Sequence, residues 1–102
     1  MKLEHYPVEK IKKEIRAIVE KHLDLKEYKL FFFGSRVDGK NHKGSDIDVG
    51  IEGPERISSP VWLEIQEEIE NLPILYKIEI VDFKRVSREF KEVALSHAEP
   101  IK

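Results

Sequence analysis

The hydrophobic residues of this chain recur at two spacings, one typical of helices and the other typical of strands. Between residues 7 and 22, apolar residues return every three or four positions, which predicts an amphipathic helix. Segments 29–33, 47–52 and 76–83 are short and rich in aromatic and β-branched residues, and each is predicted to be a strand. The helix needs a sheet to cover its apolar face, so these elements are expected to pack together.

Two further helices are predicted in the second half of the chain. Residues 53–59 are a cluster of turn-forming residues, after which Ser59 can cap a helix that has Pro60 at its first position and ends before Pro73. A last short helix is predicted over residues 87–95. Because helices and strands alternate, the pattern predicts an α/β (α+β) fold in which helices flank a small mixed sheet.

Length and composition limit the classes of protein that the chain can represent. At 102 residues it can bury one modest core, so residues 1–102 are predicted to form a single domain. The lack of cysteine excludes disulfides and thiol catalysis. With no signal peptide and no long apolar run, a soluble cytoplasmic protein that is not bound to a membrane is expected. The net charge of −2 provides no basic field and argues against a nucleic acid substrate.

The most informative segment joins the first two predicted strands. Gly34 and Ser35 form a turn at the end of the first strand, and Asp46 and Asp48 open the second. Residues two apart in a strand face the same way, so the two carboxylates can point at one cation while the apolar residues between and after them point into the core. Two such oxygen ligands suit Mg²⁺, and the turn offers phosphates a hydroxyl and accessible backbone N–H groups.

Either feature alone is an ordinary turn or loop edge, but their combination is specific. The sequence FFFGS, a polar loop and then SDIDVGI resembles the signature of the nucleotidyltransferase superfamily, which is GS, ten residues and D-x-D. This resemblance implies the DNA polymerase beta-like nucleotidyltransferase fold. Because the chain is short, it most resembles the minimal nucleotidyltransferases (MNT), the antitoxin partners of HEPN-domain proteins in toxin–antitoxin pairs.

The resemblance implies an activity, cofactors and a partner. Such an enzyme would use two Mg²⁺ ions and ATP, and it would transfer AMP to a hydroxyl group, such as that of a tyrosine, on a HEPN toxin. This AMPylation would silence the toxin, and the two proteins would form a hetero-oligomer. Larger members of the superfamily carry extra domains that hold the acceptor, so a chain this short is expected to act on a protein that docks onto it.

A third carboxylate is expected on the segment 76–83. Glu79 and Asp82 face opposite ways in a strand, and the isoleucines beside Glu79 form the apolar face. Glu79 would therefore share a face with Asp46 and Asp48 if the strands are neighbours, whereas Asp82 would cap the strand end or face solvent. In the family, Glu79 corresponds to an Asp that ligates metal, so the predicted catalytic and metal-binding residues are Asp46, Asp48 and Glu79.

The loop between the two motifs offers weaker candidates. Arg36 follows the Gly-Ser pair, where the family often has a basic residue, so it can reach a nucleotide phosphate or pair with an acid such as Asp38. The predicted nucleotide-binding residues are therefore Gly34, Ser35 and Arg36. His42 and Lys43 are expected to be solvated loop residues. Two aromatic residues, Trp62 and Tyr76, are expected to complete the core or an interface.

Two alternatives from other classes remain open at this point. Glu79 replaces the usual Asp, and Asp38 stands where the family often has a second Arg. These departures are compatible with a non-catalytic antitoxin that neutralises its partner by binding alone. They are also compatible with a nucleotide-binding regulatory module that binds ATP with Mg²⁺ and turns nothing over.

Overall fold

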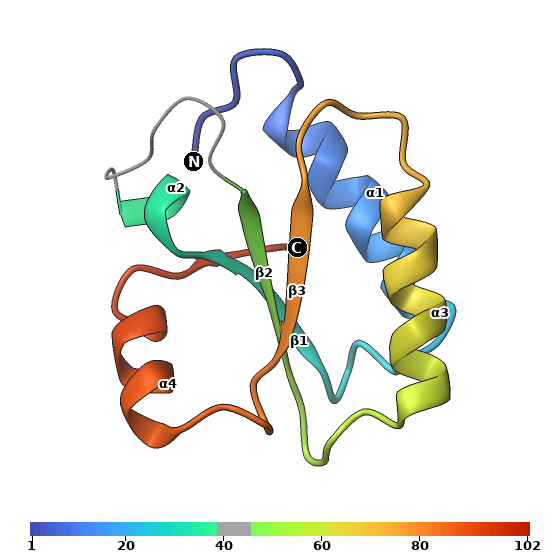
Figure 1. Ribbon diagram of the computed structural model, residues 1–102, viewed down its shortest axis with the longest axis vertical. Helices are drawn as coiled ribbons and strands as arrows, with labels where there is room; N and C mark the ends of the chain where they lie inside the picture. Colours follow the sequence, from blue (N-terminus) through green and yellow to red (C-terminus); the bar gives the residue numbers. More distant parts are fainter. Residues whose placement is uncertain (39–45) are drawn as a thin grey trace.

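A computed structural model describes residues 1–38 and 46–102 and shows helices packed on both faces of one sheet (Figure 1). No helix in this described part of the chain is both long enough and apolar enough to cross a membrane. In chain order the elements are α1 (Val8–Glu20), β1 (Lys29–Phe33), α2 (Ser35–Asp38), β2 (Ile47–Glu52), α3 (Ser59–Glu70), β3 (Ile78–Asp82), α4 (Arg88–Leu95) and β4 (Glu99–Pro100).

The four strands form a mixed sheet in the order β3-β2-β1-β4. Strand β1 runs antiparallel to both of its neighbours, and β2 runs parallel to β3, with α3 making the crossover between them. The predicted fold class, a small mixed sheet with flanking helices, is confirmed. Strands β1 and β2 have the predicted bounds, and β3 is shorter than the predicted 76–83.

Two features near the helix and strand ends differ from the sequence prediction. The residue that precedes α3 is Ser58, which is extended, whereas Ser59 is already helical; the prediction of Ser59 as the cap was therefore wrong by one residue. Strand β4 was not predicted, because two residues that include a proline carry no alternating pattern. It forms where Pro100 lies opposite Phe31 and the N–H of Ile101 donates to the carbonyl of Leu30 at 2.9 Å.

One face of the sheet is covered by α1 and α3, which lie on the same side in Figure 1. The apolar stripe of α1 and the strand residues that alternate toward it are fully buried, as the helical and strand periodicities predict. This core holds most of the buried apolar side chains. Its members with no exposed surface are Ile11, Ile15, Val19, Phe32, Ile47, Val49, Ile51 and Ile65.

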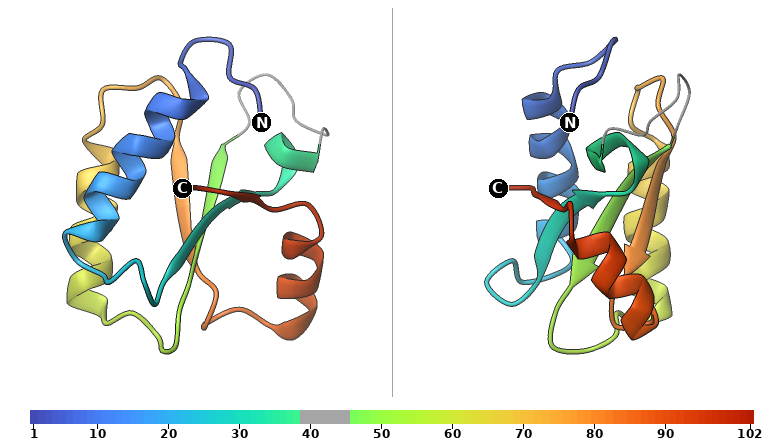
Figure 2. Two further views of the ribbon diagram at one scale, coloured as in Figure 1. Left: turned by 180° about the vertical axis from the view of Figure 1, so that it is seen from behind. Right: turned by 90° about the vertical axis from the view of Figure 1, so that its left-hand side faces the viewer.

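The opposite face is covered only in part, by α4 (Figure 2). There Phe31, Phe33 and Phe83 form a buried aromatic cluster with Ala94 of α4. The rings meet edge to face, with centroids 4.8 Å apart for Phe31 and Phe83 and 5.2 Å apart for Phe33 and Phe83. Gly50 of β2 lies under this cluster, because a Cβ there would be only 2.3 Å from the ring of Phe31. The glycine therefore allows the rings to cross β2.

Replacing Gly50 by Ala should destabilise the fold. The new methyl group would lie 2.3 Å from the Phe31 ring and 2.7 Å from the Phe83 ring, so both rings must move. Overpacking of this kind costs about 1–3 kcal/mol, and for a domain of this size the melting temperature should fall by roughly 5–15 °C. Thermal denaturation followed by circular dichroism measures the melting temperature. Leu75→Ala is the control, because Leu75 is 87% exposed. Equal melting temperatures for the two variants would contradict the prediction.

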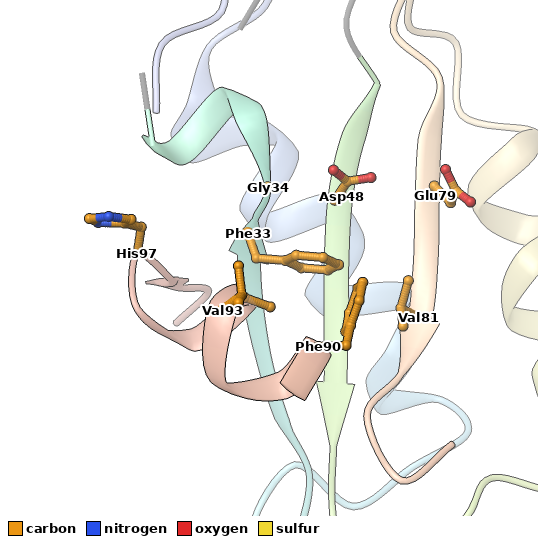
Figure 3. Close-up of a pocket in the computed structure, with 9 residues that line it drawn as sticks. Phe33, Gly34, Asp48, Glu79, Val81, Phe90, Val93 and His97 are labelled. Carbon is orange, nitrogen blue, oxygen red and sulfur yellow. The ribbon is translucent and has the colours of Figure 1, made fainter. Parts of the chain in front are cut away.

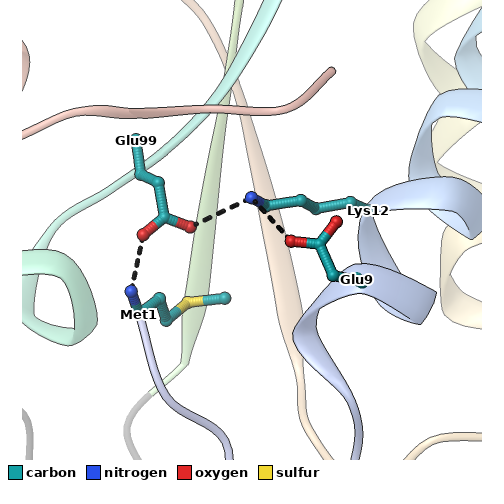
Figure 4. A network of polar contacts seen from close by, with 4 residues as sticks. All are labelled: Met1, Glu9, Lys12 and Glu99. Carbon is teal, nitrogen blue, oxygen red and sulfur yellow. Dashed lines mark hydrogen bonds and ion pairs between the residues drawn. The ribbon is translucent and has the colours of Figure 1, made fainter.

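A network of charges holds β4 against the start of the chain (Figure 4). The amino group of Met1 donates to Oε1 of Glu99 at 2.5 Å, and Nζ of Lys12 lies 3.6 Å from Oε2 of the same carboxylate. Lys12 also contacts Glu9, one helical turn earlier in α1, at 3.5 Å. Glu99 thus links the N-terminal segment and α1 to the edge of the sheet beside β1.

Candidate active site

A pocket of about 380 Å³ lies beside α4, on the face of the sheet that this helix covers only in part, at the end of β1 (Figure 3). Two carboxylates, those of Asp48 and Glu79, lie side by side at one end of it, and aromatic and aliphatic side chains form the other end. The pocket is lined by Phe33, Gly34, Asp48, Glu79, Val81, Phe90, Val93, Ala94 and His97.

The parallel register of β2 and β3 brings the two carboxylates together. Asp48 is the partner of Glu79 in this register, and paired residues on neighbouring strands lie on the same face about 5 Å apart. Asp46 precedes β2 by one residue, two positions before Asp48, so it belongs to the same edge. Ile47 and Val49 alternate with them and are fully buried on the other face. The structure therefore places Glu79, as predicted, beside Asp48.

The surroundings of Asp48 change the pKa of its side chain. Its pKa is raised from the ordinary 3.8 to about 6, first by burial and then by the negative charges of Glu79 and Asp46. Among the ion pairs within residues 1–38 and 46–102, none involves any of these three carboxylates. Bringing a cation to this edge would remove the repulsion between them.

The three carboxylates do not form a ready-made metal cage. Within the described residues, no group of three His, Cys, Asp or Glu side chains is arranged to hold a metal ion. Their oxygens are nevertheless the hard ligands that Mg²⁺ prefers, and Mg²⁺ commonly takes only one or two carboxylates and completes its shell with water and phosphate oxygens. The donor set therefore fits Mg²⁺ once the side chains turn toward it.

Gly34 separates β1 from α2 at the rim of the pocket. Its φ of 83° is in the left-handed region, and a Cβ there would lie 2.2 Å from Oδ2 of Asp48. Only glycine meets both conditions, which explains why the turn needs it. Helix α2 starts directly afterwards at Ser35.

Arg36 packs inward from α2. It is only 8% exposed, and its guanidinium carbon lies 4.9 Å from the centre of the Tyr76 ring. Tyr76 also packs against the main core, as expected, and its hydroxyl accepts a hydrogen bond from the backbone N–H of His5. The backbone of Asp38 is described but its side chain is not, so the expected pairing of Arg36 with that side chain is not tested.

The loop residues His42 and Lys43, named as weaker candidates, also lie outside the described residues. Trp62 of α3 packs partly buried against the main core, which agrees with its predicted structural role. The apolar end of the pocket was not predicted. Phe90 and Val93 reach it from α4, and the only signal in the sequence was a short helix with large apolar residues on more than one side.

Asp82 has a structural position on the opposite face. It is 5% exposed, so the alternative in which it faces solvent was wrong. Its Oδ2 accepts from the N–H of Ile57 and its Oδ1 from the N–H of Lys84, both at 2.9 Å, and Nε of Arg85 lies 3.4 Å away. Asp82 thus caps the turn after β3, as the other alternative predicted.

Because the pKa of Asp48 is raised, the stability of the metal-free fold should depend on pH. The folded state binds a proton up to about pH 6 and the unfolded state only to about pH 3.8, so the ionised carboxylate destabilises the fold increasingly as pH rises through this window. At about pH 7.5 in EDTA, Asp48→Asn should therefore raise the free energy of unfolding by about 1 kcal/mol after solvent screening, which corresponds to a few degrees in melting temperature. At about pH 4 the increase should be much smaller. Melting curves at both pH values measure this difference, and Glu67→Gln is the control because Glu67 is exposed. A pH-independent difference would contradict the assigned cause.

The mixed sheet, the Gly-Ser turn after β1 and the acidic residues on β2 and β3 together define the class of nucleotidyltransferases. The family model described as polymerase beta, nucleotidyltransferase matches residues 13–102. The chain belongs to this family and is a nucleotidyltransferase.

Known relatives agree with the family and refine it. A probable protein adenylyltransferase, MntA of Haemophilus influenzae, is 31% identical over 85 residues, which cover 81% of this chain and 75% of that protein. The resemblance to minimal nucleotidyltransferases is thereby confirmed.

Solved structures show the same fold at low sequence identity. A toxin–antitoxin crystal structure with AMP-PNP aligns with a TM-score of 0.71 at 16% identity, covering 89% of this chain and 72% of that one. A structure of the tri-AMPylated HEPN toxin of Shewanella oneidensis in complex with its MNT antitoxin gives 0.66 at 14% identity, covering 93% and 72%. At these identities the alignments establish the fold.

Proposed function

We propose that this protein is an antitoxin that transfers AMP from ATP to a hydroxyl group of a HEPN-domain partner protein in the cytoplasm. The observation that carries the proposal is the pairing of Asp48 with Glu79 beside the Gly34 turn, in a chain 31% identical to a probable protein adenylyltransferase. The solved complexes of the same fold include an AMPylated HEPN toxin with its MNT antitoxin, which supports this class of partner.

Asp46, Asp48 and Glu79 are the proposed catalytic and metal-binding residues. They would hold two Mg²⁺ ions, which supply charge neutralisation on the phosphates and a lower pKa for the acceptor hydroxyl. Glu79 is one methylene longer than the Asp usual in the family, and its partner position beside Asp48 leaves its carboxylate in reach of the same edge. The raised pKa of Asp48 supports the role, since carboxylates that repel one another favour a bound cation.

Gly34, Ser35 and Arg36 are the proposed nucleotide-binding residues. The Gly34 turn lies against Asp48, so its backbone N–H groups and the serine hydroxyl would be the donors to the phosphate oxygens. Arg36 lies at the same turn with its guanidinium against Tyr76, which would fix its position near the phosphates. The acceptor oxygen would bond to the α phosphorus as the bond to the β phosphate breaks, releasing pyrophosphate, and the hydroxyl proton would pass to water.

The proposed assembly is a hetero-oligomer with the HEPN partner. Residues 1–102 would form one domain, and its pocket lies on the face that α4 covers only in part, where a partner protein can bring a hydroxyl group. Stable interfaces bury on the order of 1,200–2,000 Å² in total, about half of it on each partner, and the 6627 Å² surface of this structure is large enough to supply that half. Neither a membrane nor a nucleic acid is part of the proposed assembly.

Co-expression with a candidate HEPN-domain protein tests the proposal. Purification by size exclusion and intact mass spectrometry should show a co-eluting partner that gains whole AMP units when ATP and Mg²⁺ are added. A matched preparation with Asp46→Asn and Asp48→Asn should co-elute without the added mass. A stable complex in which the unaltered chain adds no AMP would indicate a non-catalytic antitoxin, and ATP binding without any partner would indicate a regulatory module.

A further inference from the structure

We propose that the apolar half of the pocket binds the nucleoside of the donor nucleotide, with Phe90 of α4 stacking against the base. The inference rests on the proposed function and deepens it, because it assigns a position to the part of the donor that the carboxylates and the Gly34 turn do not contact. The apolar half consists of Phe33, Val81, Phe90, Val93 and Ala94.

The pocket is divided by polarity in the same way as a nucleoside triphosphate. Gly34, Asp48 and Glu79 lie at one end, where metal and phosphates would bind. Figure 3 shows the apolar half directly below the two carboxylates. His97, the remaining lining residue, lies beyond Val93 and away from both carboxylates. A volume of about 380 Å³ falls in the range of small-molecule sites, which are mostly apolar with a few polar groups that fix orientation.

In-line transfer is compatible with a nucleoside that lies along the strands. The phosphates that leave would lie toward Gly34 at the end of β1, and the attacking hydroxyl must then approach from the opposite side, toward Glu79 on β3. This axis runs across the sheet, so the ribose, which is attached to the α phosphorus off the axis, can extend along the strands toward α4. Two residues past Glu79 in that direction is Val81, which begins the apolar half.

Phe90 is held in place yet remains open to a ligand. Its ring centre lies 6.0 Å from that of Phe33 and 5.9 Å from that of Phe83, at interplanar angles of 81° and 57°. Its backbone N–H donates to Oγ of Ser87, which caps α4. Phe33 and Phe83 are nearly buried, whereas 43% of Phe90 is exposed. A fixed aromatic ring that shows a large apolar surface inside a pocket is suited to stack against a flat base.

The test measures two ligands on the same variants. Isothermal titration with Mg²⁺ and no acceptor should show that Phe90→Ala weakens binding of ATP about tenfold, since stacking on an aromatic side chain contributes on this scale. Binding of inorganic tripolyphosphate, which has no nucleoside, should stay within about twofold. Phe90→Trp should restore ATP affinity, and Leu95→Ala, a partly exposed residue of α4 outside the pocket lining, is the control.

Each other outcome counts against the inference in a recognisable way. Unchanged ATP affinity in Phe90→Ala, together with a higher KM for the partner protein, would assign this wall to the acceptor instead. Equal weakening of ATP and tripolyphosphate, with no recovery in Phe90→Trp, would mean that Phe90 only supports the fold. If the unaltered protein binds neither ligand, the proposed function itself fails along with the inference.

Discussion

Replacing Asp48 by Asn is expected to lower the rate of AMP transfer by roughly a hundredfold to a thousandfold or more, while the complex with the partner still forms. Asp48 is the central carboxylate of the site, with Gly34 on one side and Glu79 on the other. Asn keeps the shape of the side chain but removes the charge that a cation requires. The fold should not suffer, because ionised Asp48 gains nothing from its neighbours without metal.

The measurement is incorporation of AMP into the purified partner, from single-turnover time courses with radiolabelled ATP and Mg²⁺. Asp46→Asn should show a loss in the same direction, since its carboxylate belongs to the same edge. Glu70→Gln, an exposed acid on α3, is the matched control and should keep full activity. Transfer at the parental rate by the double variant Asp46→Asn with Asp48→Asn would overturn the assignment of both residues.

The two acids of β3 are expected to give opposite results when each is replaced by Ala. Glu79→Ala should lower the turnover rate by about a hundredfold or more and leave the melting temperature nearly unchanged, because Glu79 faces the pocket beside Asp48. Asp82→Ala should lower the melting temperature by roughly 10–20 °C, since two backbone N–H groups lose their acceptor at a cost of about 2–4 kcal/mol. The N–H groups concerned are those of Ile57 and Lys84.

Turnover and thermal melting of the same two preparations separate these roles. Below its lowered melting temperature, Asp82→Ala should transfer AMP at close to the parental rate per folded molecule, because Asp82 lies on the face opposite the pocket. Glu79→Asp, which places at this position the residue usual in the family, should retain activity. A large catalytic loss in Asp82→Ala and none in Glu79→Ala would show that the functional acid of β3 had been misassigned.

Features that depend on local periodicity could be predicted directly from the order of the residues. Strands β1 and β2 begin and end where their apolar segments do, and the period of two in a strand puts Asp48 on one face and Val49 on the other. The motif that joins Gly34 to Asp46 and Asp48 was also readable, because all its members lie within one short segment. These properties are set by neighbouring residues, so they do not depend on how the rest of the chain packs.

Which distant residues share the site depends on how the whole chain packs. The parallel register of β2 and β3 selects Glu79 over Asp82, and burial under Ile57 and Arg85 turns Asp82 into a cap. Strand β4 forms because its two residues find β1 as a partner, and α4 supplies Phe90 to the pocket because it packs on the aromatic cluster over Gly50. The physical reason is the same in these cases. Each depends on contacts between segments far apart in the chain, and packing and burial determine such contacts, whereas the local pattern of residues does not.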